Sequence, residues 1–292
     1  MNPNYKTEAA RMALDDLIKE RRDASTNTHN IATFIDESDS DPITMLCGMP
    51  EAWRFIQNQD DPEEVVFNVQ GIVTNIDLPP FNTPISRQVE QKPPQSSGEF
   101  DIAMQKLKVA NSYLTRNIKE GTEVELNCVD LAANGHPSLT LTNRYFTSKR
   151  LAPNETSIPF PPDVDPYRHL ESLSGPEYIH TADNHVEYWQ YQPILPDDTR
   201  FVKTAPSVFR IGDIVEAQFT LTLAEIRSGK PPYKYKAIAT LRTVTLFNKK
   251  YTDDAKHAMI TQVNEVKTLK RKIGMQDEMH RDAEKKMREM SV

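Results

Sequence analysis

Residues 208–251 read VFRIGDIVEAQFTLTLAEIRSGKPPYKYKAIATLRTVTLFNKKY, and this segment decides the fold. It holds two runs rich in β-branched and aromatic residues, and the turn-forming stretch RSGKPPY separates them. Such runs on either side of a turn predict two long antiparallel β-strands joined as a hairpin. We therefore expect a β-rich domain built around this hairpin.

Side chains alternate between the two faces of a β-strand, so the hairpin has two distinct faces. In the first strand, Phe219 and Leu223 share one face with other apolar residues. In the second strand, alternation puts Leu241 and Phe247 on one face and Val244 on the opposite one. The more apolar face of each strand is predicted to point into the core.

The second half of the hairpin is strongly basic. From Arg227 to Thr252 the chain carries seven Lys or Arg and no Asp or Glu, although the net charge of the whole protein is −7. Single-strand nucleic-acid binders combine cations for phosphates with flat rings for base stacking. The simpler alternative is that lysines on an edge strand prevent aggregation. The candidate nucleic-acid-binding residues are Arg227, Lys230, Tyr233, Lys234, Tyr235, Lys236, Arg242, Lys249 and Lys250.

Composition excludes several classes of function. The chain has 292 residues, of which 38% are hydrophobic, and only 9 glycines. It contains no GxGxxG or GxxxxGK[ST] phosphate loop and no GxSxG nucleophile motif. Neither Cys47 nor Cys128 belongs to a CxxC pair, which excludes a zinc finger by count. No run approaches the ~20 apolar residues of a membrane span, and the first residues lack the apolar core of a signal peptide. We expect an intracellular protein, nuclear or cytoplasmic, with no catalytic residue, no cofactor and no membrane partner.

Composition and periodicity divide the chain into three parts. Residues 3–23 place apolar side chains at helical spacing, and residues 43–58 are predicted to form a short helix. Residues 99–118 fit both a strand and a helix. The predicted parts are a helical N-terminal arm and linker at 1–60, a β-rich domain at 61–251 with Pro-rich loops at 79–98 and 153–166, and a C-terminal helix at 252–292.

The strands predicted within 64–251 are unevenly spaced, and Gly71 inside one of them indicates a bulge or sharp bend. This pattern suits a small Greek-key barrel of the OB type. A β-sandwich and an α+β sheet are the alternatives. The predicted fold class is mainly β with flanking helices, as an OB-like Greek-key barrel or a sandwich with elaborated loops and a long C-terminal helix.

Residues 253–290 lack β-forming patterns and predict one long helix. In a heptad that starts at Met259, seven of the ten a and d positions are apolar, while Gln262, Gln276 and His280 interrupt the seam. We expect a weak coiled coil or a helix that docks on a partner, which gives either a homo-oligomer or a complex with another protein. The candidate interaction residues are Met259, Val266, Leu269, Ile273 and Met287.

Residues that can bind metals lie close together in the sequence HTADNH. Zinc would accept His180, Asp183 and His185 as ligands, with His169 or Glu187 as a fourth. The spacing matches no recognised zinc site, and a polar turn carries such residues for solubility alone. We expect no bound metal here.

FRIGDIVEAQ at 209–218, followed by YKAIATLRTVTL at 235–246, resembles an uncharacterised multicopy family of mushroom-forming fungi. Members have an F-R-x-G-D-I-V-E-x-Q strand, a lysine-bearing hairpin, an L-R-S-I-x-L-L-like strand and a charged C-terminal helix. The HTADN sequence from His180 is similar to a segment that precedes this core, so the resemblance covers roughly 165–275. It implies no known activity. More loosely, the G-D-x-V strand and its hairpin are similar to phage-type single-strand-DNA-binding OB proteins.

The sequence favours a non-enzymatic binding module whose basic, tyrosine-bearing hairpin binds single-stranded nucleic acid. The alternative is a protein-interaction or scaffold module that assembles through the C-terminal helix. A metal-dependent enzyme built around His180 and His185 is the third hypothesis.

Overall fold

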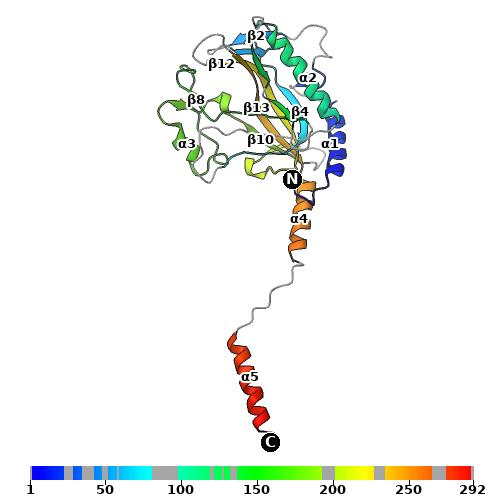
Figure 1. Ribbon diagram of the computed structural model, residues 1–292. Helices are drawn as coiled ribbons and strands as arrows, with labels where there is room; N and C mark the ends of the chain where they lie inside the picture. Colours follow the sequence, from blue (N-terminus) through cyan, green and yellow to red (C-terminus); the bar gives the residue numbers. More distant parts are fainter. Residues whose placement is uncertain are drawn as a thin grey trace. The chain divides into compact units, whose positions relative to one another are not determined.

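Figure 1 shows the computed structural model of the chain. The chain divides into two compact units, Met1–Ala255 and Lys256–Val292. Within the described residues, no helix has the length and apolar character needed to cross a membrane. The structure describes residues 2–22, 29–34, 43–47, 52–57, 59–80, 98–118, 122–126, 128–131, 137–192, 201–226, 234–264 and 274–290.

The described part of the first unit is mainly β, with a few flanking helices. The described helices of the whole chain are α1 (Thr7–Arg22), α2 (Gly98–Thr115), α3 (His169–Ser174), α4 (Lys250–Asn264) and α5 (Gly274–Glu289), with 3-10 turns η1 (Ala182–Asn184) and η2 (Pro206–Val208). Helix α4 begins in the first unit and ends in the second, and α5 belongs to the second. The strands are β1 (His29–Asn30), β2 (Thr44–Cys47), β3 (Ala52–Phe55), β4 (Phe67–Ile72), β5 (Val124–Leu126), β6 (Val129–Leu131), β7 (Pro137–Leu139), β8 (Thr147–Ser148), β9 (Tyr178–Ile179), β10 (Glu187–Tyr191), β11 (Phe201–Lys203), β12 (Ile214–Ile226) and β13 (Lys234–Asn248).

One mixed sheet dominates the fold and curls into a half-barrel. Its order is β1-β4-β12-β13-β10-β11, while β3 pairs with both β2 and β12, and β5 pairs with β13. The antiparallel pair of β12 and β13 forms the centre, which confirms the long hairpin predicted from the sequence. Each of these two strands has two shorter neighbours along its outer edge: β4 and β3 on β12, and β10 and β5 on β13.

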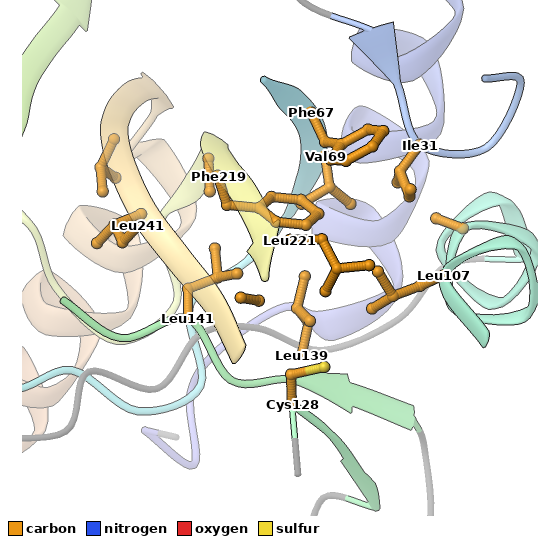
Figure 2. Close-up of a cluster of buried hydrophobic side chains, with 14 of the residues drawn as sticks. Ile31, Phe67, Val69, Leu107, Cys128, Leu139, Leu141, Phe219, Leu221 and Leu241 are labelled. Atoms are coloured by element: carbon orange, nitrogen blue, oxygen red, sulfur yellow. The ribbon is translucent and has the colours of Figure 1, made fainter. Parts of the chain in front are cut away.

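The inner face of this sheet forms the main hydrophobic core. Phe67, Phe219 and Leu241 come from three neighbouring strands and are almost fully buried. Leu107 of α2 reaches toward Leu221 of β12 from the other side of this core (Figure 2). Truncating one of the buried rings to Ala would cost about 3–5 kcal/mol. Packing under α2 therefore holds the central hairpin in place.

Helix α1 packs on the opposite face of the sheet. Ala10, Leu14 and Ile18 follow one another at intervals of one helical turn, and all three are buried. They pack against Ile72 of β4 and Ile214 of β12, which face each other in the strand register. The apolar spacing predicted a helix over 3–23, and α1 confirms it.

The turn before β12 requires a glycine at position 212. Gly212 has a φ of 103°, and a Cβ atom there would lie 2.8 Å from the ring of Tyr5. The Tyr5 hydroxyl donates a hydrogen bond to the Gly212 carbonyl at 2.6 Å. Asp213 closes the turn, because its carboxylate accepts a hydrogen bond from the Arg210 amide at 2.8 Å. This geometry explains the Gly-Asp pair of the FRIGDIVEAQ segment.

In two segments the sequence pattern fits both a helix and a strand, and tertiary packing decides which secondary structure forms. Residues 43–58 were predicted to contain a short helix, and this is wrong, because they form strands β2 and β3. The ambiguous segment 99–118 forms α2, whose Phe100, Leu107 and Leu114 lie seven residues apart and face the core.

The region predicted as one long C-terminal helix contains two described helices. Helix α4 ends at Asn264 and α5 begins at Gly274, and residues 265–273 lie outside the described residues. A single helix over 253–290 therefore stays a prediction. Most of the Pro-rich segment at 79–98 also lies outside the described residues.

Candidate nucleic-acid-binding face

A bulge in β13 changes which face its side chains occupy. The register against β12 skips Arg242, which lies between Leu241 and Thr243 as an extra residue. An inserted residue shifts the alternation of a strand by one position. Leu241 and, beyond the bulge, Leu246 both point into the core, whereas Phe247 points to the outer face. The prediction that Phe247 shares a face with Leu241 is therefore wrong.

Aromatic rings gather on this outer face. Tyr191 and Phe247 are stacked, with ring centroids 5.1 Å apart and an interplanar angle of 24°. Phe201 lies 5.4 Å from Tyr191 and 6.1 Å from Phe247. Trp189 lies on the same face of β10, because it alternates with the buried Tyr188. Among the described residues, neither buried hydrophobic cluster includes Trp189, Tyr191, Phe201 or Phe247, which we call the outer aromatic cluster.

Lys203 supplies a positive charge beside Trp189. Its ammonium lies 5.2 Å from the Trp189 ring centroid and 3.1 Å from the Glu187 carboxylate. The Trp189 indole donates a hydrogen bond to the same carboxylate at 3.2 Å. Partial burial opposes ionisation of Glu187, but the hydrogen bonds from Lys203 and Trp189 outweigh it and hold the pKa of Glu187 below its usual value. The indole is therefore fixed next to an exposed cation.

Arg21 connects α1 to the outer aromatic cluster. Its guanidinium donates hydrogen bonds to Glu216 at 2.8 and 3.0 Å, and it lies 5.4 Å from the Phe247 ring and 5.9 Å from the Phe201 ring. Glu216 is only 2% exposed, and it also accepts a hydrogen bond from Gln70 at 2.9 Å. A buried carboxylate needs such partners. Arg21 therefore supports the outer aromatic cluster from the α1 side.

The extra residue of the bulge, Arg242, forms the centre of a charge network. Its guanidinium contacts Glu64 at 2.9 Å and Asp183 at 2.8 Å. Arg54 pairs with Glu64 at 3.1 Å, and Arg144 lies 3.8 Å from Asp183. Partial burial opposes ionisation of Asp183, but the charge of Arg242 outweighs it and lowers the pKa of Asp183. We call Arg54, Glu64, Arg144, Asp183 and Arg242 the arginine network.

The basic residues predicted from the sequence are spread along β13 rather than gathered in one place. Lys234 is exposed and forms an ion pair with Glu123 at 2.7 Å, which raises the pKa of Lys234. Tyr235 packs against the core, and Lys236 is half-buried. Of the three candidates described at this end of the hairpin, Lys234 is ion-paired, Tyr235 packs on the core and Lys236 is half-buried.

At the other end of β13, Lys249 and Lys250 are exposed and directly follow Phe247 and Asn248. Lys249 lies thirteen positions after Lys236, which corresponds to about 43 Å of extended chain. The two ends cannot form one compact basic patch. Arg227, Lys230 and Tyr233 lie outside the described residues.

The candidate interaction residues of the C-terminal helix are only partly described. Met259 on α4 is 53% exposed, and Met287 on α5 is 74% exposed. Val266, Leu269 and Ile273 lie outside the described residues.

The histidine cluster does not converge on one point. His180 is buried, and its ring stacks on Phe160 at 3.9 Å, while Asp183 belongs to the arginine network. His185 is half-buried and lines a small cavity together with His180. Within the described ranges, no group of three or more His, Cys, Asp or Glu side chains could hold a metal ion.

No protein-family model and no curated protein matches the chain. The outer aromatic cluster is therefore defined by geometry alone. Sequence reasoning missed Trp189, Tyr191, Phe201 and Lys203 as site residues. The available signal was the Trp-x-Tyr alternation in EYWQY at 187–191, which puts two rings on one face of a strand.

Proposed function

We propose that the protein binds single-stranded nucleic acid on the outer face of β10, β11 and β13. The outer aromatic cluster is the observation that supports this proposal. Stacking on an aromatic ring is sequence-tolerant because every base has a flat face, and nearby cations neutralise the phosphates. Lys203 lies beside the cluster, and Lys249 and Lys250 follow Phe247 along the chain after Asn248.

The proposal places the bases on the rings and the phosphates at these three lysines. The ion pair of Lys203 with Glu187 is solvent-exposed, so exchanging the carboxylate for a phosphate costs little. Lys234 and Lys236 lie at the far end of the hairpin and contribute less to binding. A short segment of a few nucleotides is the expected ligand.

Fluorescence anisotropy with a labelled single-stranded DNA oligonucleotide tests the proposal. Three phosphate contacts predict that log K falls with log salt concentration with a slope of about −2. Changing Lys249 and Lys250 together to Gln should weaken binding and reduce the steepness of this slope by about 1.4. The matched control is the double change of Lys234 and Lys236 to Gln, which should leave the slope close to that of the wild type. No binding by the wild type at low salt would reject the proposal.

We further propose that the curled sheet is an elaborated OB-type barrel. The proposal is supported by the long central hairpin and by the bulge at Arg242, because bulges increase the local twist that barrel closure needs. A crystal structure of the full chain would test it. Closure of the sheet into a Greek-key barrel supports the proposal, and an open sheet rejects it.

A second candidate function is assembly through α5. Met279 and Met287 are both 74% exposed, and their spacing with Ala283 places them along one side of the helix. Met290, which follows the last residue of α5, is 87% exposed. Methionine adapts well to apolar protein interfaces. Light scattering should then show a dimer for the full chain and a monomer for a chain that ends at Ala255. Two monomers of equal thermal stability would reject assembly through this helix.

A further inference from the structure

A small cavity lies between η1, the start of β10 and the segment around Phe160. Its volume is about 10 Å³, and its lining includes Tyr145, Phe160, His180, Asn184 and His185. A single water molecule needs roughly 10–15 Å³ and two to four polar partners. The pocket is partly open to solvent, and the space enclosed by its lining fits one water-sized molecule.

The first polar group of this cavity is a hydrogen-bond acceptor. The Nδ1 atom of His180 lies 3.0 Å from the carbonyl oxygen of Tyr145. A carbonyl oxygen only accepts, so Nδ1 must carry the proton. Burial lowers the pKa of His180 and keeps the imidazole neutral, which leaves Nε2 as an acceptor. This Nε2 atom is buried and has no hydrogen-bond partner among the described residues.

The second polar group is a donor. The Oδ1 atom of Asn184 accepts hydrogen bonds from the Thr181 amide at 3.1 Å and from the Thr147 hydroxyl at 3.0 Å. Because an amide N–H can only donate, this contact fixes the orientation of the Asn184 side chain. Its Nδ2 group is then the donor, and within the described residues it has no partner although it is buried. Asn184 is 3% exposed and His180 is 5% exposed.

We propose that this pocket is a binding site for one ordered water molecule that bridges His180 and Asn184. The water accepts a hydrogen bond from Asn184 Nδ2 and donates one to His180 Nε2. Buried polar atoms need a hydrogen-bond partner, and this one water molecule gives a partner to both side chains. It also joins the two ends of the turn that carries Asp183 of the arginine network.

A crystal structure of the full chain tests the site directly. We expect a well-ordered density peak at hydrogen-bonding distance from both Nε2 of His180 and Nδ2 of Asn184. The absence of such a peak in a map that shows other ordered water molecules would overturn the proposal, and so would a collapsed cavity in which the two side chains bond each other.

A variant tests whether His180 holds the water. His180→Phe keeps the stacking on Phe160 but removes the Nε2 acceptor together with the Nδ1 donor to the Tyr145 carbonyl, so it should lose the density peak and lower the midpoint of thermal unfolding by several degrees. His257→Phe, at an exposed position on α4, is the matched control and should leave the midpoint unchanged. If His180→Phe keeps the density peak, His180 does not hold the water and the proposal is wrong.

Discussion

The ring of Phe247 is stacked on the ring of Tyr191, 5.1 Å away across the parallel pair of β13 and β10. This contact exists because the register between β12 and β13 skips Arg242, which shifts the alternation and turns Phe247 away from the core. A second irregularity skips Phe247 itself, between the pairs Val215–Leu246 and Ile214–Asn248. The pair then forms the middle of a half-exposed aromatic face rather than part of the buried interior.

Removing either ring should weaken the binding of single-stranded DNA without unfolding the protein. We expect Phe247→Ala and Tyr191→Ala each to reduce affinity by about 1–3 kcal/mol, the usual contribution of one stacked base. Tyr167→Ala removes an aromatic ring that is 62% exposed near α3 and should bind like the wild type. Anisotropy titrations measure the affinities, and circular dichroism confirms that each variant is folded. Wild-type affinity in a folded Phe247→Ala variant would contradict the stacking role.

Arg242 is expected to act mainly in stability. Its side chain is 18% exposed and neutralises Glu64 and Asp183 together. Glu64 and Asp183 are 26% and 44% exposed, so removing their shared guanidinium costs about 1–3 kcal/mol, because both carboxylates lose a charged hydrogen-bond donor. Arg242→Met should therefore lower the free energy of unfolding in urea by this amount, whereas Lys236→Met on the same strand should change it by about 0.5 kcal/mol or less. Equal values for the two variants would show that the network does not stabilise the fold.

Gly212 and Gly175 allow backbone strain to be compared with and without a steric clash of an added Cβ atom. Both have positive φ values, 103° and 58°, but an added Cβ would meet Tyr5 at 2.8 Å at position 212 and nothing within 4 Å at position 175. Backbone strain alone costs about 1–3 kcal/mol. Gly212→Ala should therefore destabilise the protein more than Gly175→Ala in thermal unfolding. The reverse order would mean that Tyr5 moves aside at little cost.

Asp183 should make part of the stability depend on pH. Its pKa is lower in the folded protein than the ordinary value of 3.8, so its stabilising contribution is complete above that value and is lost as the pH falls through the folded pKa. The side chain is 44% exposed, which limits the contribution to about 1 kcal/mol or less. The difference in unfolding free energy between the wild type and Asp183→Asn should therefore shrink between pH 5 and pH 2. A difference that stays constant over this range would contradict the ionic role of Asp183.

The local spacing of apolar residues was sufficient to predict the central hairpin and helix α1. The alternation in 208–251 predicted the central hairpin, because its inner face is apolar over a long stretch. The helical spacing of Ala10, Leu14 and Ile18 likewise predicted α1. Residues 43–58 were misjudged because a short apolar segment fits a helix and a strand equally well, and pairing of β3 with β12 decides between them.

The site was harder to predict because it depends on contacts between distant residues. A bulge in β13 decides the orientation of Phe247. The only local sign of the bulge is that Leu241 and Leu246 are both apolar, although strict alternation would put them on opposite faces of the strand. Arg21 reaches Glu216 through packing of α1, and no local spacing encodes this contact. Basic composition pointed to the whole hairpin, whereas the aromatic rings lie at one end of it.

The fluorescence of Trp189 gives the most direct measurement of binding at the outer face. The chain has two tryptophans, so a Trp53→Phe variant reports on Trp189 alone. We predict saturable quenching of this fluorescence by a single-stranded oligonucleotide, with the same dissociation constant as the anisotropy titration, and little quenching by the corresponding duplex. Binding in the anisotropy titration without quenching of Trp189, or no binding at all, would contradict the proposed role of the outer aromatic cluster.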